Sequence, residues 1–341
     1  MTTETRMNSR TSNVIAKKLV LVVLVAAFSC VLAISSVAGP PSSQKASPPQ
    51  PGQKTFATPQ QAAEALIQAA EKFDVPALNE MFGPDGKDLV TTADAVQDKN
   101  RVALFVAKAH EKTSVTTDPK NRGRAILSVG DDEWPFPVPI VKKGGIWYFD
   151  SKAGLGEIFL RRIGANELDA IAVCRGFVGA QEEYASQIHD DSGIAQYAQR
   201  IISTPGKRDG LVWRNPDGSL GGPISEKIAD AIEEGYSKRS EPYHGYYFKV
   251  LKGQGPAAPM GQLDFVIGGV MIGGFALVAA PAEYRVTGVQ TFIVSHDGIV
   301  YQKDLGPDTL QAFKDMERYN PDKTWHRTDD EWPPEVAAAA E

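Results

Sequence analysis

The chain has 341 residues, of which 42% are hydrophobic and 23% are charged, and 36 Lys and Arg against 42 Asp and Glu give a formal charge of −6. This composition excludes a chain that is disordered throughout, and the presence of a single long apolar run excludes a polytopic membrane protein. The acidic balance argues against a nucleic-acid binder, which would present a basic face.

The first 38 residues are predicted to be an export signal. Four basic residues precede an apolar stretch over residues 19–34, and Ser36 and Ala38 supply the small side chains that a signal peptidase reads. Cleavage after Ala38 would remove four basic residues and one acidic residue, so the formal charge would change from −6 to −9. We therefore expect a periplasmic or extracellular protein.

Two alternatives to simple cleavage stay open. Residues 19–38 are long enough to remain as a membrane anchor, and Cys30 invites a lipoprotein interpretation. If the signal is removed, Cys174 is left without a disulfide partner, and its apolar helical surroundings predict a buried side chain. Residues 39–55 contain five prolines and almost no apolar residue, which predicts a semi-rigid linker.

Residues 56–162 are expected to form an N-terminal α+β domain. Thr58, Pro59 and Gln61 begin a helix as a capping box does, and Asp74 begins a second, shorter helix. A third helix is expected over residues 95–112. The hydrophobic period then changes to two, which predicts strands over 124–129, 136–141 and 146–149, with a hairpin turn at 142–145.

Residues 163–317 are expected to form a C-terminal α+β domain. A long helix is predicted to begin at Gly164 or Asn166 and to end near His189, followed by shorter helices over 197–202 and 224–232. Strands are predicted over 246–251, 263–267, 275–280, 288–294 and 299–303. Residues 318–341, polar and then alanine-rich, are predicted to be a frayed tail.

Helices that precede a meander of strands indicate the α+β class, with antiparallel sheets in both domains. The first domain resembles the cone of nuclear-transport-factor-2-like proteins, in its helical pair over 58–82 and its strand over 145–150. That resemblance implies a pocket between helices and sheet, which Trp134 and Trp147 would line. The alternative is that both rings are core residues.

Several strings resemble a bacterial family catalogued as domain of unknown function 2950. The strings are Phe56-Ala57-Thr58-Pro59, Trp134-Pro135-Phe136-Pro137, Gly164 to Leu168, Ser203 to Gly210, Pro242 to Phe248 and Gly288 to Val294. The resemblance implies an exported protein without an established activity.

Residues 165–304 also resemble the globular part of type IV pilins and secretion pseudopilins. The matching elements include Asn166-Glu167 at a helix start, the strand after Gly245, and Asp297-Gly298 in the final turn. A pilin has an apolar helix that runs straight into this one, whereas here a separate domain intervenes. The resemblance implies a pseudopilin-like partner of a secretion system, although assembly by the usual route does not fit.

The sequence lacks the motifs of several common catalytic and ligand-binding sites. His110-Glu111 has no second histidine for a zinc protease site, no C-x-x-C is present, and Gly206-Lys207 lacks the other residues of a phosphate loop. No cofactor and no metal are therefore predicted. Asp190 and Asp191 are the residues that resemble a metal site, because they precede a turn glycine as in a shortened calcium loop. The alternative is that they form a solvated helix end.

His244 is the catalytic candidate. It stands at a predicted strand start between Tyr243 and Tyr246, and strand alternation would place His244 and Tyr246 on one side. A carboxylate partner such as Glu283 or Asp297 would make His244 a base. The alternative is an edge-strand histidine that hydrogen-bonds to backbone.

Residues 203–210 are the best surface candidate for a functional loop, because they are polar, rich in turn residues and basic at Lys207 and Arg208. The binding candidates are thus Trp134, Trp147, Tyr243, Tyr246, Lys207 and Arg208. We expect an exported envelope protein that binds a protein or small ligand, or assists assembly, without catalysis. A hydrolase that uses His244, and a pseudopilin-like role, are the alternatives.

Overall fold

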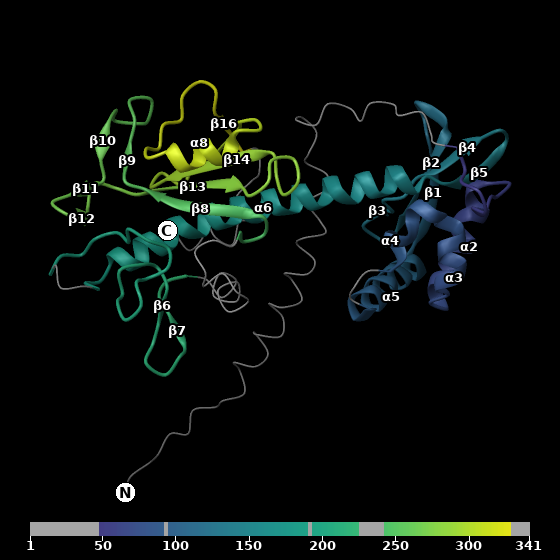
Figure 1. Cartoon of the computed structure of the whole chain (residues 1–341), viewed down its shortest axis with the longest axis horizontal. Coiled ribbons are helices and arrows are strands. Elements are labelled where there is room, and N and C mark those ends of the chain that lie inside the picture. Colours follow the sequence, from purple (N-terminus) through teal and green to yellow (C-terminus); the bar gives the residue numbers. More distant parts are fainter. Residues whose placement is uncertain (1–47, 92–94, 190–192, 225–241, 329–341) are drawn as a thin grey trace, which may run out of the picture. The chain divides into compact units, whose positions relative to one another are not determined.

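The computed structural model describes residues 48–91, 95–189, 193–224 and 242–328. The chain divides into two compact units, Met1–Leu160 and Arg161–Glu341, and the dividing point lies inside helix α6 (Ser151–Ala185). Each unit contains helices and an antiparallel sheet, so the predicted α+β class is confirmed (Figure 1). The predicted export signal and most of the predicted linker lie outside the described residues.

The helices of unit 1 begin where capping residues predict. Thr58 accepts a hydrogen bond from the backbone N–H of Gln61, and Asp74 accepts one from Ala77, so both predicted N-caps are confirmed. The helices are α2 (Pro59–Glu71), α3 (Val75–Phe82), α4 (Lys87–Val90) and α5 (Ala95–Glu111), with a 3₁₀ turn, η2, at Pro84–Gly86.

The sheet of unit 1 has the order β1-β2-β4-β5, and β3 pairs with β2. The strands are β1 (Thr113–Asp118), β2 (Asn121–Val129), β3 (Trp134–Pro135), β4 (Ile140–Lys143) and β5 (Ile146–Phe149). The predicted strand over 136–141 is wrong before Ile140, because Pro137 and Pro139 cannot donate to a ladder. The predicted hairpin turn is confirmed, and Gly144 and Gly145 adopt its positive φ angles of 60° and 89°.

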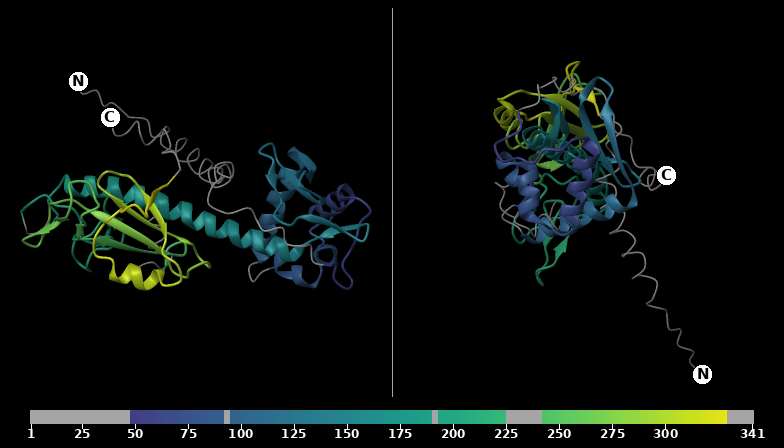
Figure 2. Two further views of the ribbon diagram at one scale, coloured as in Figure 1. Left: turned by 90° about the horizontal axis from the view of Figure 1, so that it is seen from above. Right: turned by 90° about the vertical axis from the view of Figure 1, so that its right-hand side faces the viewer.

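The core of unit 1 lies between its helices and the sheet (Figures 1 and 2). Phe82 of α3 contacts Phe149 of β5 with ring centroids 5.3 Å apart, and Phe136 packs against Phe105 of α5 at 5.2 Å. Ser151 closes this core, since its hydroxyl donates to the carbonyl of Phe82 at 2.5 Å.

Helix α6 begins earlier than predicted. The sequence predicts a start at Gly164 or Asn166, but the helix begins at Ser151, where the Asp150 carboxylate accepts from the N–H of Ala153. Three glycines, at 154, 156 and 164, lower helix propensity and break the apolar pattern before residue 166. The helix ends at Ala185 rather than near His189.

Unit 2 contains a five-stranded antiparallel sheet of order β16-β15-β14-β13-β8. Its strands are β8 (Tyr246–Leu251), β13 (Ala276–Pro281), β14 (Gln290–Ser295), β15 (Tyr301–Asp304) and β16 (His326–Arg327). The remaining elements are three short hairpins, β6 (Trp213–Arg214) with β7 (Leu220–Gly221), β9 (Gly253–Gln254) with β10 (Leu263–Asp264) and β11 (Val266–Ile267) with β12 (Val270–Met271), and helix α8 (Thr309–Asp315).

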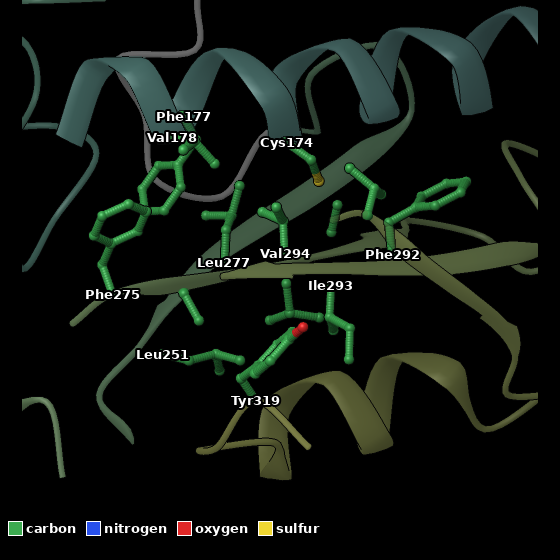
Figure 3. Packing of buried hydrophobic residues seen from close by; sticks show 14 of the residues in the cluster. Cys174, Phe177, Val178, Leu251, Phe275, Leu277, Phe292, Ile293, Val294 and Tyr319 are labelled. Carbon is green, nitrogen blue, oxygen red and sulfur yellow. The ribbon is translucent and has the colours of Figure 1, made fainter. Parts of the chain in front are cut away.

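Both faces of this sheet are covered. Figure 3 shows Cys174 and Phe177 of α6 pointing to Leu277 and Val294 on one face, while Tyr319 lies against the other face on the side of α8. Alternation along the strands explains the arrangement, because neighbouring residues point to opposite faces. Cys174 is fully buried and free of disulfides, and burial raises the pKa of its thiol, so the predicted buried cysteine is confirmed.

Two further predictions in unit 2 differ from the structure. Residues 197–202 are not helical, because the side chain of Gln181 exchanges two hydrogen bonds with the backbone of Ala198 and holds it extended against α6. The predicted frayed tail is wrong over residues 318–328, where Tyr319 is fully buried and β16 joins the sheet. The predicted helix over 224–232 lies outside the described residues after Ile224.

Among the residues that the structure describes, no helix is both long enough and apolar enough to cross a membrane.

Candidate functional site

His244 lies in the turn before β8 and pairs with a carboxylate. Its Nδ1 hydrogen-bonds to Oδ2 of Asp169 on α6, and the two side chains are 49% and 46% exposed. The sequence proposed Glu283 or Asp297 as the partner, and the structure places Asp169 there instead. A carboxylate hydrogen-bonded to Nδ1 fixes the orientation of the imidazole ring.

The prediction that the side chains of His244 and Tyr246 lie on the same side of the strand is wrong. His244 and Gly245 have positive φ angles of 45° and 75°, so strand alternation does not extend back to His244. Tyr246 is fully buried, its hydroxyl donates to the carbonyl of Gln290 at 2.8 Å, and burial raises its pKa. Tyr246 is therefore a core residue, while the ring of Tyr243 stacks on His244 with centroids 4.2 Å apart.

A small apolar hollow lies beside this pair. Tyr243 and Phe248 line it together with side chains of α6 such as Val173 and Phe177. Its volume of about 20 Å³ is room for about one water molecule. The pair can act as a base toward a ligand at the surface, but the hollow is too small to hold a substrate side chain.

The predicted functional loop over 203–210 is internally braced. The backbone N–H and hydroxyl of Thr204 donate to Asp209 at 2.7 and 2.8 Å, and Ser203 and Gly210 bond across the loop's base. Partial burial opposes the charged form of Asp209, but the bonds from Thr204 and the charge of Arg200 lower its pKa.

Lys207 and Arg208 are exposed at the tip of this loop. The guanidinium of Arg208 lies 5.3 Å from the ring centroid of Trp213, and its carbonyl accepts from the hydroxyl of Tyr184 at 2.6 Å. Arg208 is thus held by the scaffold, whereas Lys207 projects from it.

The predicted candidates Trp134, Trp147, Asp190 and Asp191 form no site with His244 or the 203–210 loop among the described residues. Trp147 is buried and exchanges two backbone hydrogen bonds of 2.8 Å with Phe56, and Trp134 packs against Phe136 at a ring distance of 6.4 Å. Both tryptophans therefore contribute to the core of unit 1. Asp190 and Asp191 lie outside the described residues, and within those residues no three His, Cys, Asp or Glu side chains gather as a metal site.

A larger groove, which the sequence did not predict, lies in unit 2 between the end of β8 and the chain that leaves α8. Its volume is about 490 Å³. Its lining combines charged side chains with apolar ones and consists of residues 249–253, Asp264, Val266, Lys314 and Met316–Arg318.

Arg318 joins the walls of the groove. Its guanidinium donates to the carbonyls of Gln254 and Leu263, both at 3.2 Å, and to the carboxylate of Asp264 at 2.5 Å. Gly253 makes this position possible, since a Cβ there would stand 2.7 Å from Nη1 of Arg318. The backbone of Tyr319 adds bonds to Gly253 and Gly255 at 2.9 and 2.8 Å.

Lys249 joins β8 to the end of α8. Its ammonium donates to the carbonyls of Phe313 and Lys314 at 2.6 and 2.9 Å. These carbonyls belong to the last turn of α8, where a cation is favourable. Burial lowers the pKa of Lys249, which the charges of Glu317 and Asp315 partly offset. The groove therefore has walls fixed by hydrogen bonds before any ligand arrives.

Part of this groove could have been recognised in the sequence from its basic residues. Lys249 interrupts the otherwise apolar strand over 246–251, and Lys314 and Arg318 are four residues apart. Their meeting depends on the sheet order, which places β8 at the edge next to β13, and on α8, a helix that packs against β13 and that the sequence pattern did not reveal.

A family model described as "Protein of unknown function (DUF2950)" matches residues 53–328. Neither the search of curated proteins nor the search of solved structures found a match.

Proposed function

The chain belongs to this DUF2950 family of unknown function, and within it we propose that the protein is exported to the cell envelope and acts there by binding, without catalysing a reaction. Export is supported by the basic and apolar leader and by the small residues at Ser36 and Ala38. The binding role is supported by the geometry of unit 2.

The observation that carries the binding role is the groove beside β8. Its volume of about 490 Å³ lies within the range of roughly 300–1,000 Å³ that is typical of small-ligand sites. Preformed walls favour binding, because less conformational entropy is lost when the ligand is captured. Arg318 and Lys249 supply those walls through five hydrogen bonds to fixed groups.

The test is ligand capture from the envelope. The purified chain is mixed with the low-molecular-mass fraction of an envelope extract, and retained compounds are identified by mass spectrometry. Val266→Trp, which fills the groove with an indole, is compared with Val286→Trp, an exposed position outside it. We expect a compound that the parent chain and Val286→Trp retain and Val266→Trp loses; equal retention by all three, or none, contradicts the proposal.

A second candidate function is hydrolysis with His244 as the base. The observation that favours it is the contact of His244 with Asp169, since a histidine oriented by a carboxylate is a recurring general base. The base would take a proton from a water molecule that attacks an ester or amide carbonyl. The imidazolium would then return that proton to the departing alcohol or amine as the C–O or C–N bond breaks.

This candidate predicts turnover of an ester or peptide panel that falls by about 10²–10⁴ in kcat in His244→Asn. Asp169→Asn should lower turnover less, because it removes only the orienting charge. Absence of turnover by the parent chain across the panel would remove the hydrolase function and leave the binding role intact.

A further inference from the structure

The groove beside β8 is a positive region on an acidic chain. Four cationic side chains and two carboxylates line it, whereas the whole chain has 42 acidic and 36 basic residues. The cations are Lys249, Lys252, Lys314 and Arg318, and the carboxylates are Asp264 and Glu317. Four cations against two carboxylates leave the lining with a net charge of +2, and a hollow with an excess of one sign of charge concentrates ligands of the other sign.

The four cations have two different roles. Lys249 and Arg318 are bonded to carbonyls and, for Arg318, to Asp264, so they fix the walls. Lys252 and Lys314 are exposed, and within the described part of the chain their ammonium groups have no hydrogen bond or ion pair. A ligand can therefore use both ammonium groups without breaking an existing contact.

The two ammonium groups come from different walls. Lys252 follows β8 directly, and Lys314 is in the last turn of α8. Arg318 neutralises Asp264, which leaves Glu317 as the lining carboxylate that has no ion pair among the described residues. The described residues that line the groove include no aromatic ring, so the stacking surface that sugars use is absent from this lining.

We propose that the groove binds a small multivalent anion, a molecule with at least two phosphate or carboxylate groups, through the ammonium groups of Lys252 and Lys314. The inference rests on the proposed binding function and names its ligand class. Phosphates and carboxylates share the chemistry that lysine recognises, which is a negative charge on hydrogen-bond acceptor oxygens.

The experiment is calorimetric titration of the purified chain with two probes, inorganic pyrophosphate and citrate. The double variant Lys252→Ala with Lys314→Ala is compared with Lys120→Ala with Lys143→Ala, which removes the same charge from an exposed turn and the exposed end of β4 in unit 1. The groove pair should raise Kd at least tenfold, and the control pair less than twofold. Higher salt should also raise Kd, because exposed charges are screened. Binding of only one probe would identify phosphate or carboxylate as the source.

Three outcomes would overturn the inference. Equal weakening in both double variants would mean that overall charge, not the groove, attracts the anion. The chain could instead bind cellobiose or spermidine but neither anion, with Val266→Trp abolishing that binding. This result would reject an anion as the ligand class and would keep the proposed binding function. If neither anion binds and the envelope fraction yields no retained compound, the inference and the proposed function both fail.

Discussion

Glu167 is a partly buried carboxylate that connects α6 to the start of β14. Its Oε1 accepts from the backbone N–H groups of Val289 and Gln290 at 2.8 and 3.0 Å. Burial raises the pKa of Glu167 and the two backbone bonds only partly offset it. The neighbouring Asn166 donates to the carbonyl of Thr287 at 2.8 Å, so both residues position the same segment.

Because the folded-state pKa of Glu167 is raised, the folded chain holds its proton where the unfolded chain has lost it. Its contribution to stability is present below the ordinary value of 4.5 and is lost as pH rises through the raised pKa. We therefore expect Glu167→Gln to gain stability relative to the parent chain as pH rises from 4 to 7. Urea unfolding at several pH values measures the difference, and parallel pH profiles would contradict the expectation.

Tyr319 has a hydroxyl without a hydrogen-bond partner among the described residues, although its side chain is fully buried. Tyr319→Phe removes a hydroxyl that has lost its contact with water without forming a hydrogen bond in the described part of the chain. The substitution should therefore stabilise the chain by about 1 kcal/mol. Tyr246→Phe is the control, because it deletes a bond to Gln290 and should cost about 1 kcal/mol. Chemical denaturation compares them; a loss of stability in Tyr319→Phe would show a partner for its hydroxyl.

At the scale of the element, the first turns of α6 offer a pair of glycines with opposite roles. A Cβ at Gly154 would stand 2.6 Å from Cγ2 of the buried Val138, whereas a Cβ at Gly156 would meet no atom within 4 Å. Gly156→Ala should stabilise by up to about 1 kcal/mol through helix propensity. Gly154→Ala should destabilise by about 1–3 kcal/mol through overpacking. Thermal unfolding measures both, and equal shifts would contradict the packing of α6 against Val138.

Elements with strong local signals could be predicted from the sequence. Thr58 and Asp74 begin helices because their side chains can accept from the first turn, and Gly144-Gly145 forms a hairpin because both residues tolerate positive φ. Segments whose conformation depends on tertiary contacts could not be predicted from the sequence. The segment around Ala198 has a helical pattern, but two bonds from Gln181 hold it extended.

The candidate site was predictable only in part, for a related reason. His244 was identified by its neighbours in sequence, but its partner Asp169 is 75 positions away and lies on a helix. The groove residues come from β8, β9, β10, β11 and the end of α8 with the chain that follows it, and no local sequence pattern links them. The likeness of unit 1 to nuclear-transport-factor-2-like cones and of unit 2 to pilins stays a prediction, as does the pseudopilin-like role.

At the scale of the whole molecule, export is the prediction that decides where any ligand is met. N-terminal sequencing of the chain from the envelope fraction should begin at Gly39, with a mass that lacks the first 38 residues. Ala38→Trp should block cleavage, because the peptidase requires a small residue there. A parent chain recovered with its leader in the membrane fraction would instead support the anchor over residues 19–38.

Hydrogen exchange of the whole chain, with and without the compounds retained from the envelope, tests directly whether the groove beside β8 binds a ligand. We expect slower exchange in peptides that cover residues 249–254 and 314–318, because ligand binding at the groove would suppress opening of its walls. Peptides from unit 1 should be unchanged. Protection confined to the 203–210 loop or to the region of His244, with none at the groove, would show that the ligand binds elsewhere and would contradict the proposed binding site.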